Sequence, residues 1–271
     1  MNTVAVPTWL GVAASVVLVL VAAAVAGWQR LGVTREMLIA ATRAGVQLVA
    51  IGAILGALFT HAGVAGALGW VALMVLIAGQ VGGRRGAGVP SAARSATIGI
   101  AVGAAATLGV LLVLRMITAE ARVIVPVGGM VVSGAMMAAS IVLRRLREQV
   151  VDARAQVEAR LALGIAAHAA FAPQLRSALR TALIPNIDGT KVVGLISLPG
   201  AMTGLILAGV PPLTAIRYQV VVMWMLLASA ALAGLVTARL AERALFDPAH
   251  RLRTLVERPP RRWLSWAGRT G

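Results

Sequence analysis

Residues 8–28, TWLGVAASVVLVLVAAAVAGW, form an apolar run without a charged side chain, and Gln29-Arg30 follows it directly. An α-helix rises 1.5 Å per residue, so about 20 such residues cross the ~30 Å hydrocarbon core of a bilayer. A secretory signal carries positive charge before its apolar run, whereas here the charge comes after it. The run is therefore expected to be a first transmembrane helix whose N-terminus faces outward.

The rest of the 271-residue chain has the same apolar character. Hydrophobic residues make up 59% of the sequence and charged residues 13%, a balance outside the range of soluble proteins. We therefore expect an all-α integral membrane protein, a polytopic bundle of about seven transmembrane helices. The expected spans are residues 8–28, 38–59, 63–81, 95–115, 123–143, 191–210 and 214–238. They would form one transmembrane domain, residues 1–246, followed by a flexible Arg-rich tail, residues 247–271.

Positive charges predict the orientation of these spans. The chain holds 25 Lys and Arg against 9 Asp and Glu, a net charge of +16. Most of them lie in the loops at 29–37, 82–94 and 144–191 and in the tail after 238, which the positive-inside rule assigns to the cytoplasm. The chain is thus predicted to cross the cytoplasmic (inner) membrane several times, with its C-terminus inside. Charges between apolar runs are topology signals and give no support for nucleic-acid binding.

Two further features limit the chemistry of the chain. It contains no cysteine, which excludes disulfides and thiolate metal sites. The tail is expected to touch anionic lipid headgroups through its arginines, Trp263 and Trp266.

The sixth expected span is unusual because Pro199-Gly200 lies near its middle. Lipid offers no hydrogen-bond partner to the backbone groups that a proline frees. We therefore expect one span with an internal break that faces the bundle interior or a dimer seam, where Gly200-x-x-x-Gly204 would also fit. Asp188, just before this span, is expected to cap its N-terminus or to pair with Lys191.

The long polar segment between the fifth and sixth spans, residues 144–190, predicts two amphipathic cytoplasmic helices that meet at Gly164. The second helix is expected over about 168–183, ending at Ile184-Pro185. Such a pair can offer a docking surface to a partner or can be a simple hairpin on the membrane surface. The residue pattern alone does not decide between the two.

Glu158-Ala159 followed by Gly164 resembles the cytoplasmic "EAA" loop of ABC-transporter permeases. Three further stretches, RAGVQL (43–48), VPVGGMVVSGAMMA (125–138) and RSALRTALIPNIDGTKVVGLISLPGAMTGLILAGVPPLTAIRYQ (176–219), resemble the FetB-like iron-export ABC permease family. Related plant proteins of that family are linked to aluminium tolerance. The resemblance covers about residues 30–245.

This resemblance implies a permease subunit that moves a metal ion, iron, outward. It also implies a coupling helix near Gly164 that fits a groove on an ATPase subunit, and two permeases paired with two ATPases. The chain contains no G-x-x-x-x-G-K-[ST] motif, so it is not expected to be an enzyme or to bind a cofactor. ATP and Mg would bind to the partner ATPase subunit.

A translocation path is expected where polar or soft side chains occur inside spans. The fifth span places four of them on one helical face: Met130, Ser133, Met137 and Ser140. The other path candidates are Arg43, Gln47, Pro199, Gly200, Met202 and Thr203. Arg43 could instead reach the inner headgroups, and the methionine face could instead be packing. Thioethers of Met130, Met137 and Met202 could hold a soft metal, but they do not identify it.

Two other functions remain open from the sequence. One is a secondary transporter driven by an ion gradient, against which stand the lack of carboxylates deep in the spans and of inverted repeats. The other is a membrane scaffold that transports nothing.

Overall fold

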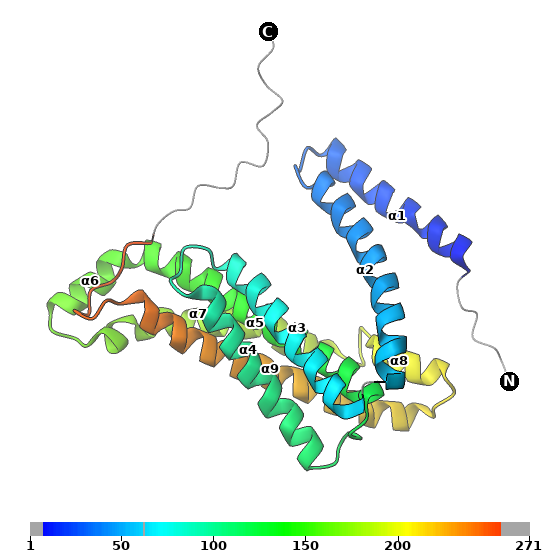
Figure 1. Cartoon of the computed structure of the whole chain (residues 1–271). Coiled ribbons are helices and arrows are strands. Elements are labelled where there is room, and N and C mark those ends of the chain that lie inside the picture. Colours follow the sequence, from blue (N-terminus) through cyan, green and yellow to red (C-terminus); the bar gives the residue numbers. More distant parts are fainter. Residues whose placement is uncertain (1–7, 62, 256–271) are drawn as a thin grey trace, which may run out of the picture.

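The computed structural model describes residues 8–61 and 63–255, and these residues form an all-helical bundle (Figure 1). Its helices are α1 (Trp9–Trp28), α2 (Thr34–His61), α3 (Gly63–Arg85), α4 (Ala92–Val113), α5 (Ala121–Asp152), α6 (Arg154–Ala162), α7 (Ala167–Val192), α8 (Gly200–Leu207) and α9 (Pro212–Leu245). Six of them, α1 to α5 and α9, are long and apolar enough to cross a membrane. The expected class of polytopic helical membrane protein is confirmed.

The sixth expected span, residues 191–210, is interrupted before Gly200, but the interruption is a turn that begins after Val192 and is longer than the expected break at Pro199-Gly200. Helix α7 already ends at Val192 and α8 begins only at Gly200. Between them Gly194 has φ +84°, a left-handed conformation that leaves the helical path, and Pro199 has no N–H to continue one. The stretch is therefore two helical pieces joined by a turn.

Helix α7 also differs from the prediction. It does not end at Ile184-Pro185 but continues through Pro173 and Pro185 to Val192. An interior proline costs about 3 kcal/mol in an isolated helix, and here the packing of α7 against α5 and α9 outweighs that cost. Asp188 consequently lies inside α7 and caps no helix, but it does form the expected ion pair with Lys191, at 3.3 Å.

Close helix packing at glycines builds the core of α3, α4, α5 and α9. Gly83 of α3 faces the backbone of Ala93 on α4, and Gly99 of α4 faces α9 at Ala233 and Thr237. Small residues let helix backbones approach without a hydrophobic driving force in lipid. These contacts fix the helices relative to one another along their length.

Helices α3, α5 and α9 run in one direction. Val71 of α3 lies against Gly128 of α5, and Leu143 lies against Gly86 just after α3. Ser229 of α9 donates a hydrogen bond to the Val131 carbonyl of α5, at 3.5 Å. A second contact between α5 and α9 joins Val142 to Gly234, so along both pairs of helices the contacts advance together and the three helices are parallel.

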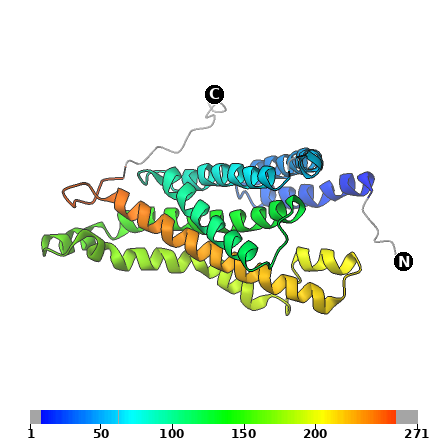
Figure 2. The ribbon, with the colours of Figure 1, turned by 60° about the horizontal axis from the view of Figure 1, so that its bottom comes forward.

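Helix α7 runs in the opposite direction to α5 and α9. Near its start, Phe171 packs edge-to-face on Phe246, just after the end of α9, with ring centroids 6.0 Å apart. About two turns later, Leu179 lies beside Gly234, nearer the start of α9. Helix α7 therefore returns along the bundle, and Figure 2 shows α6 and α8 at opposite ends of it.

Helices α1 and α2 lean away from this core (Figure 1). They contact each other more than they contact the rest of the bundle. No residue of α2 is buried among those whose exposure is described. The pair thus leaves most of its apolar surface to lipid or to another chain.

Candidate coupling site

Helix α6 lies at the end of the bundle where α5 ends and α7 begins (Figure 2). This end also carries the arginines that follow the apolar parts of α3, α5 and α9, and we refer to it as the basic end. Val157 of α6 is fully buried in the core. The helix is therefore part of the folded domain and its exposed face has a defined position.

Gly164 ends α6 in a turn that requires glycine. The Gly164 N–H donates to the Leu161 carbonyl at 2.9 Å, and the Ile165 N–H donates to the Arg160 carbonyl at 3.2 Å. This pair of bonds is the Schellman motif, in which the residue after the helix takes a left-handed conformation. Gly164 has φ +82° and is exposed, so it shapes the tip of the segment.

Arg160 ties α6 to the start of α7. Its guanidinium donates to the Ala170 carbonyl at 3.0 Å and to Oε1 of Gln174 at 3.2 Å. Gln174 is buried, so its amide oxygen needs a donor inside the protein. Arg160 supplies that donor and holds α6 and α7 together.

Residues 246–255, which we call the C-terminal strap, fold back onto α6. The strap turns where the Asp247 carboxylate accepts the Arg251 N–H at 2.8 Å, and Phe246 forms an isolated β-bridge with Leu252. Leu252 is buried, and Phe246 packs on Phe171 of α7. Residues 247–255 belong to the tail that was expected to be flexible, and in the structure they are part of the strap, which packs on α6 and α7. The rest of that tail, residues 256–271 with Trp263 and Trp266, lies outside the described residues.

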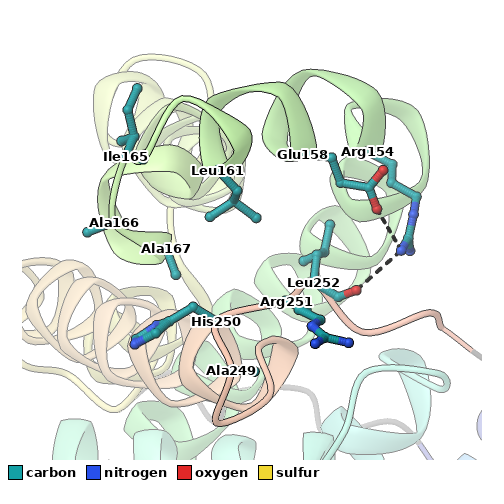
Figure 3. Close-up of a pocket in the computed structure, with 11 residues that line it drawn as sticks. Arg154, Glu158, Leu161, Ile165, Ala166, Ala167, Ala249, His250, Arg251 and Leu252 are labelled. Carbon is teal, nitrogen blue, oxygen red and sulfur yellow. Dashed lines mark hydrogen bonds and ion pairs between the residues drawn. The ribbon is translucent and has the colours of Figure 1, made fainter.

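Arg154 joins α6 to the strap and to Glu158. Its guanidinium lies 2.8 Å from the Glu158 carboxylate and donates to the carbonyls of Leu252 and Arg253 at 3.2 and 3.4 Å. Figure 3 shows these side chains at one edge of an open cavity of about 650 Å³. Leu161 and Ala167 lie on one side of the cavity and His250 of the strap on the other.

The coupling residues expected from the sequence therefore lie on one surface. Glu158 is half exposed, Ala159 is exposed beside it, and Gly164 lines the same cavity. The strap is the part of this surface that sequence reasoning missed. The turn-forming Asp247-Pro248 and the apolar Leu252 were signals that could have indicated it.

Arg154→Ala is expected to release the strap. The substitution removes two hydrogen bonds from a charged donor, each contributing about 1 kcal/mol at a partly exposed position. Tryptic cleavage at Arg251 and Arg253 should then be about fivefold faster or more. Arg145→Ala is the matched control because Arg145 pairs with Glu148 on α5 at 2.7 Å and makes no bond to the strap. Equal cleavage rates in both variants would contradict this role of Arg154.

The residues that the sequence suggested for a translocation path lie in three separate places. On α5, Ser133 and Met137 are exposed and Met130 is half-buried, whereas Ser140 is buried and donates to the Met136 carbonyl at 2.6 Å. Pro199 and Gly200 begin α8, where Met202 is buried and Thr203 donates to the Pro199 carbonyl at 3.2 Å. Arg43 and Gln47 are exposed on α2. The structure does not bring these three groups together into one site.

A metal site is not visible in the described parts of the chain. Within residues 8–61 and 63–255, no three His, Cys, Asp or Glu side chains gather in a way that could hold a metal ion. The roles of Met130, Met137 and Met202 toward a metal remain predictions.

Comparisons with known proteins agree with this architecture along nearly the whole chain. A family model described as "Uncharacterised protein family (UPF0014)" matches residues 9–246. The chain belongs to this family. The match includes every helix of the bundle, and it ends where the strap begins.

Named relatives of UPF0014 come from bacteria and plants. The chain is 41% identical to UPF0014 membrane protein STAR2 of Oryza sativa over 90% of its own length and 85% of the relative. It is 33% identical to the probable iron export permease protein FetB of Escherichia coli, over 89% and 93% of the two chains. It is 35% identical to protein ALUMINUM SENSITIVE 3 of Arabidopsis thaliana, over 90% and 89%. No solved structure matches the chain.

Proposed function

We propose that this UPF0014 chain is the membrane-spanning permease subunit of an ABC transporter that exports a metal ion. The observation that carries the proposal is the surface at the basic end, where Glu158 and Ala159 project from α6 and Gly164 forms the turn that ends it. A relative named as a probable iron export permease supports iron as the cargo and export as the direction. ATP and Mg would bind to a separate ATPase subunit, which docks on this surface from the cytoplasm.

The contacts of α6 favour a docking surface for a partner rather than a simple hairpin on the membrane surface. A coupling element must transmit force, so it needs rigid attachment to the transmembrane core. Val157 anchors α6 in that core, Arg160 ties it to α7, and Arg154 ties it to the strap. The open cavity beside Gly164 leaves room for side chains of a partner.

The assembly that follows from this proposal contains two copies of the chain and two ATPase subunits. The apolar surfaces of α1 and α2, which the core leaves uncovered, offer area for the second copy as well as for lipid. With the basic end inside, the N-terminus lies outside the inner membrane.

Glu158→Arg is expected to abolish docking of the ATPase. The full chain would be co-expressed with an ABC ATPase subunit encoded beside it and purified by a tag on the permease. Because the substitution reverses a charge at the proposed contact, the ATPase recovered should fall about tenfold or more. Glu148→Arg is the control: Glu148 is an equally exposed, ion-paired glutamate at the basic end that lies outside the cavity. An unchanged yield with Glu158→Arg would refute the docking assignment.

A further inference from the structure

The connection between α5 and α9 contains one more membrane crossing than apolar composition alone indicates. Helices α5 and α9 are both apolar enough to span a membrane and they run in the same direction. The chain between them must therefore return across the bilayer. Within that connection, α7 is the helix that lies antiparallel along both of them.

The position of α7 suits the inner part of this return. Its residues 181–192 extend ~18 Å at 1.5 Å per residue, so the turn that follows and α8 (Gly200–Leu207) lie in the remainder of the ~30 Å hydrocarbon core. Leu179 lies beside Gly234 of α9, as do Ala138 and Val142, which are near the basic end of the apolar part of α5, where Arg144 follows. Arg180 therefore lies at the inner boundary of the membrane, and residues 181–192 lie at the depth of the apolar stretch.

One face of α7 is too polar for lipid. Leu175, Ala178 and Ala182 are buried against the core, and the opposite face is exposed. That exposed face carries Arg176, Arg180, Ile184, Asp188 and Lys191. Helix α7 is absent from the set of helices apolar enough to span a membrane, and charged side chains at this depth face water or protein.

A buried amide on the same helix adds a second observation. The Asn186 Nδ2 atom is buried and has no hydrogen-bond partner among the described residues. An unpaired buried amide is unfavourable, and a hydrogen bond to a water molecule or a polar ligand would remove that cost. Asn186 lies between Arg180 and Lys191, at the depth where lipid supplies no partner.

Arg176 and Arg180 set the charge of this face at the basic end. The two lie one helical turn apart and are exposed, and within residues 8–61 and 63–255 neither forms an ion pair or a side-chain hydrogen bond. Arginine binds planar oxyanions such as carboxylates and phosphates in a bidentate manner. The acidic side chain on the same face, Asp188, is already paired with Lys191.

We propose that α7 forms the inner, polar part of a seventh crossing and lines a water-filled path, and that Arg176 and Arg180 form an oxyanion-binding mouth at its inner end. The choice of solute rests on the proposed permease function. The exported metal then enters the path with carboxylate or phosphate ligands as an anionic complex. On α5, against which α7 packs, the residues exposed at this depth include Ser133 and Met137.

The crossing can be tested with single cysteines, because the full chain has none of its own. Ala208→Cys lies at the exposed end of α8, just before α9 begins, and Gln156→Cys lies on the exposed face of α6. In sealed membrane vesicles of known orientation, a membrane-impermeant maleimide should label the two positions from opposite sides. Labelling of both from the same side would overturn the crossing.

The path can be tested with two cysteines at nearly the same depth. The side chain at Ile184 is 46% exposed and that at Ala182 is fully buried. Because thiol reactivity follows access, Ile184→Cys should react about tenfold faster than Ala182→Cys with water-soluble methanethiosulfonates. If the exposed face of α7 were covered by lipid, both would be equally unreactive, and the path would be refuted.

The oxyanion mouth can be tested by reagent charge in the Ile184→Cys chain. The rate of thiol modification is measured with an anionic sulfonatoethyl reagent and with a cationic trimethylammonioethyl reagent. The ratio of the first rate to the second is then divided by the same ratio for a free thiol in solution. Two nearby cationic groups should raise this ratio about tenfold at low salt, and Arg176→Gln with Arg180→Gln should remove the preference. Arg217→Gln, near the opposite end of α9, is the control. An unchanged ratio in the double variant would refute the mouth.

These labelling experiments use neither ATP nor the ATPase subunit. Loss of ATPase docking would therefore refute the proposed function and leave the crossing and the path intact. Failure of the labelling pattern would refute α7 as a path and leave the docking surface intact.

Discussion

Gly99→Ala is expected to prevent stable packing of α4 on α9. A methyl group at Gly99 would overlap Thr237 Oγ1 and would lie 2.7 Å from the Ala233 carbonyl oxygen. Thr237 is fully buried and its hydroxyl donates to the Ser95 carbonyl at 3.4 Å, so it has no free direction in which to move. The two helix backbones would have to separate, and we expect a loss of roughly 3 kcal/mol in the free energy of unfolding.

Gly109→Ala on the same helix provides the control. Nothing lies within 4 Å of a methyl group built there, so the change should not destabilise the chain and should add up to about 1 kcal/mol through the better helix propensity of alanine. Both variants can be followed by thermal unfolding of the purified full chain in detergent. Equal stability of the two would contradict the close α4–α9 contact.

Gly164→Val is expected to uncouple the permease from its ATPase while the chain still inserts. The left-handed conformation costs a residue with a Cβ atom about 1–2 kcal/mol, and a β-branched side chain is among the least tolerant. The Schellman turn would open and the tip of the segment would change direction. We expect ATP hydrolysis by the assembled complex to fall about tenfold, as for loss of a positioned contact.

Gly164→Asn tests whether the left-handed conformation, and not the added volume of a side chain, causes the loss of activity. Asparagine tolerates the left-handed conformation, and no atom lies near a side chain placed at this position. The asparagine variant should retain most of the hydrolysis that the valine variant loses. If both variants lost activity equally, the left-handed turn would not be what matters at Gly164.

Apolar composition predicted six helices of this fold because long runs such as 8–28 have no other stable place than lipid. The same reasoning was incomplete at 191–210, where a break was expected at Pro199-Gly200 but the helix already ends at Val192 and turns at Gly194. It failed at α7, where Pro185 was expected to end the helix and the polar side chains gave no sign of a long one. Only the directions of α5 and α9, a property of the folded chain, show that α7 must return between them.

The coupling surface could be predicted in part. Gly164 marked a helix end correctly because the left-handed turn needs a residue without a Cβ atom. The role of Arg154 depends on Leu252 and Arg253, which are almost a hundred residues away in the sequence. Local spacing cannot reveal such a contact, so the strap became visible only in the fold.

The most direct test of the account measures iron movement in liposomes that contain the full chain with its ATPase subunit. We predict transport of iron that requires ATP, stops with Glu158→Arg and is absent when the chain is reconstituted alone. The same assay with copper, zinc and manganese identifies the cargo. Iron movement by the chain alone, driven by an ion gradient and indifferent to ATP, would contradict the account.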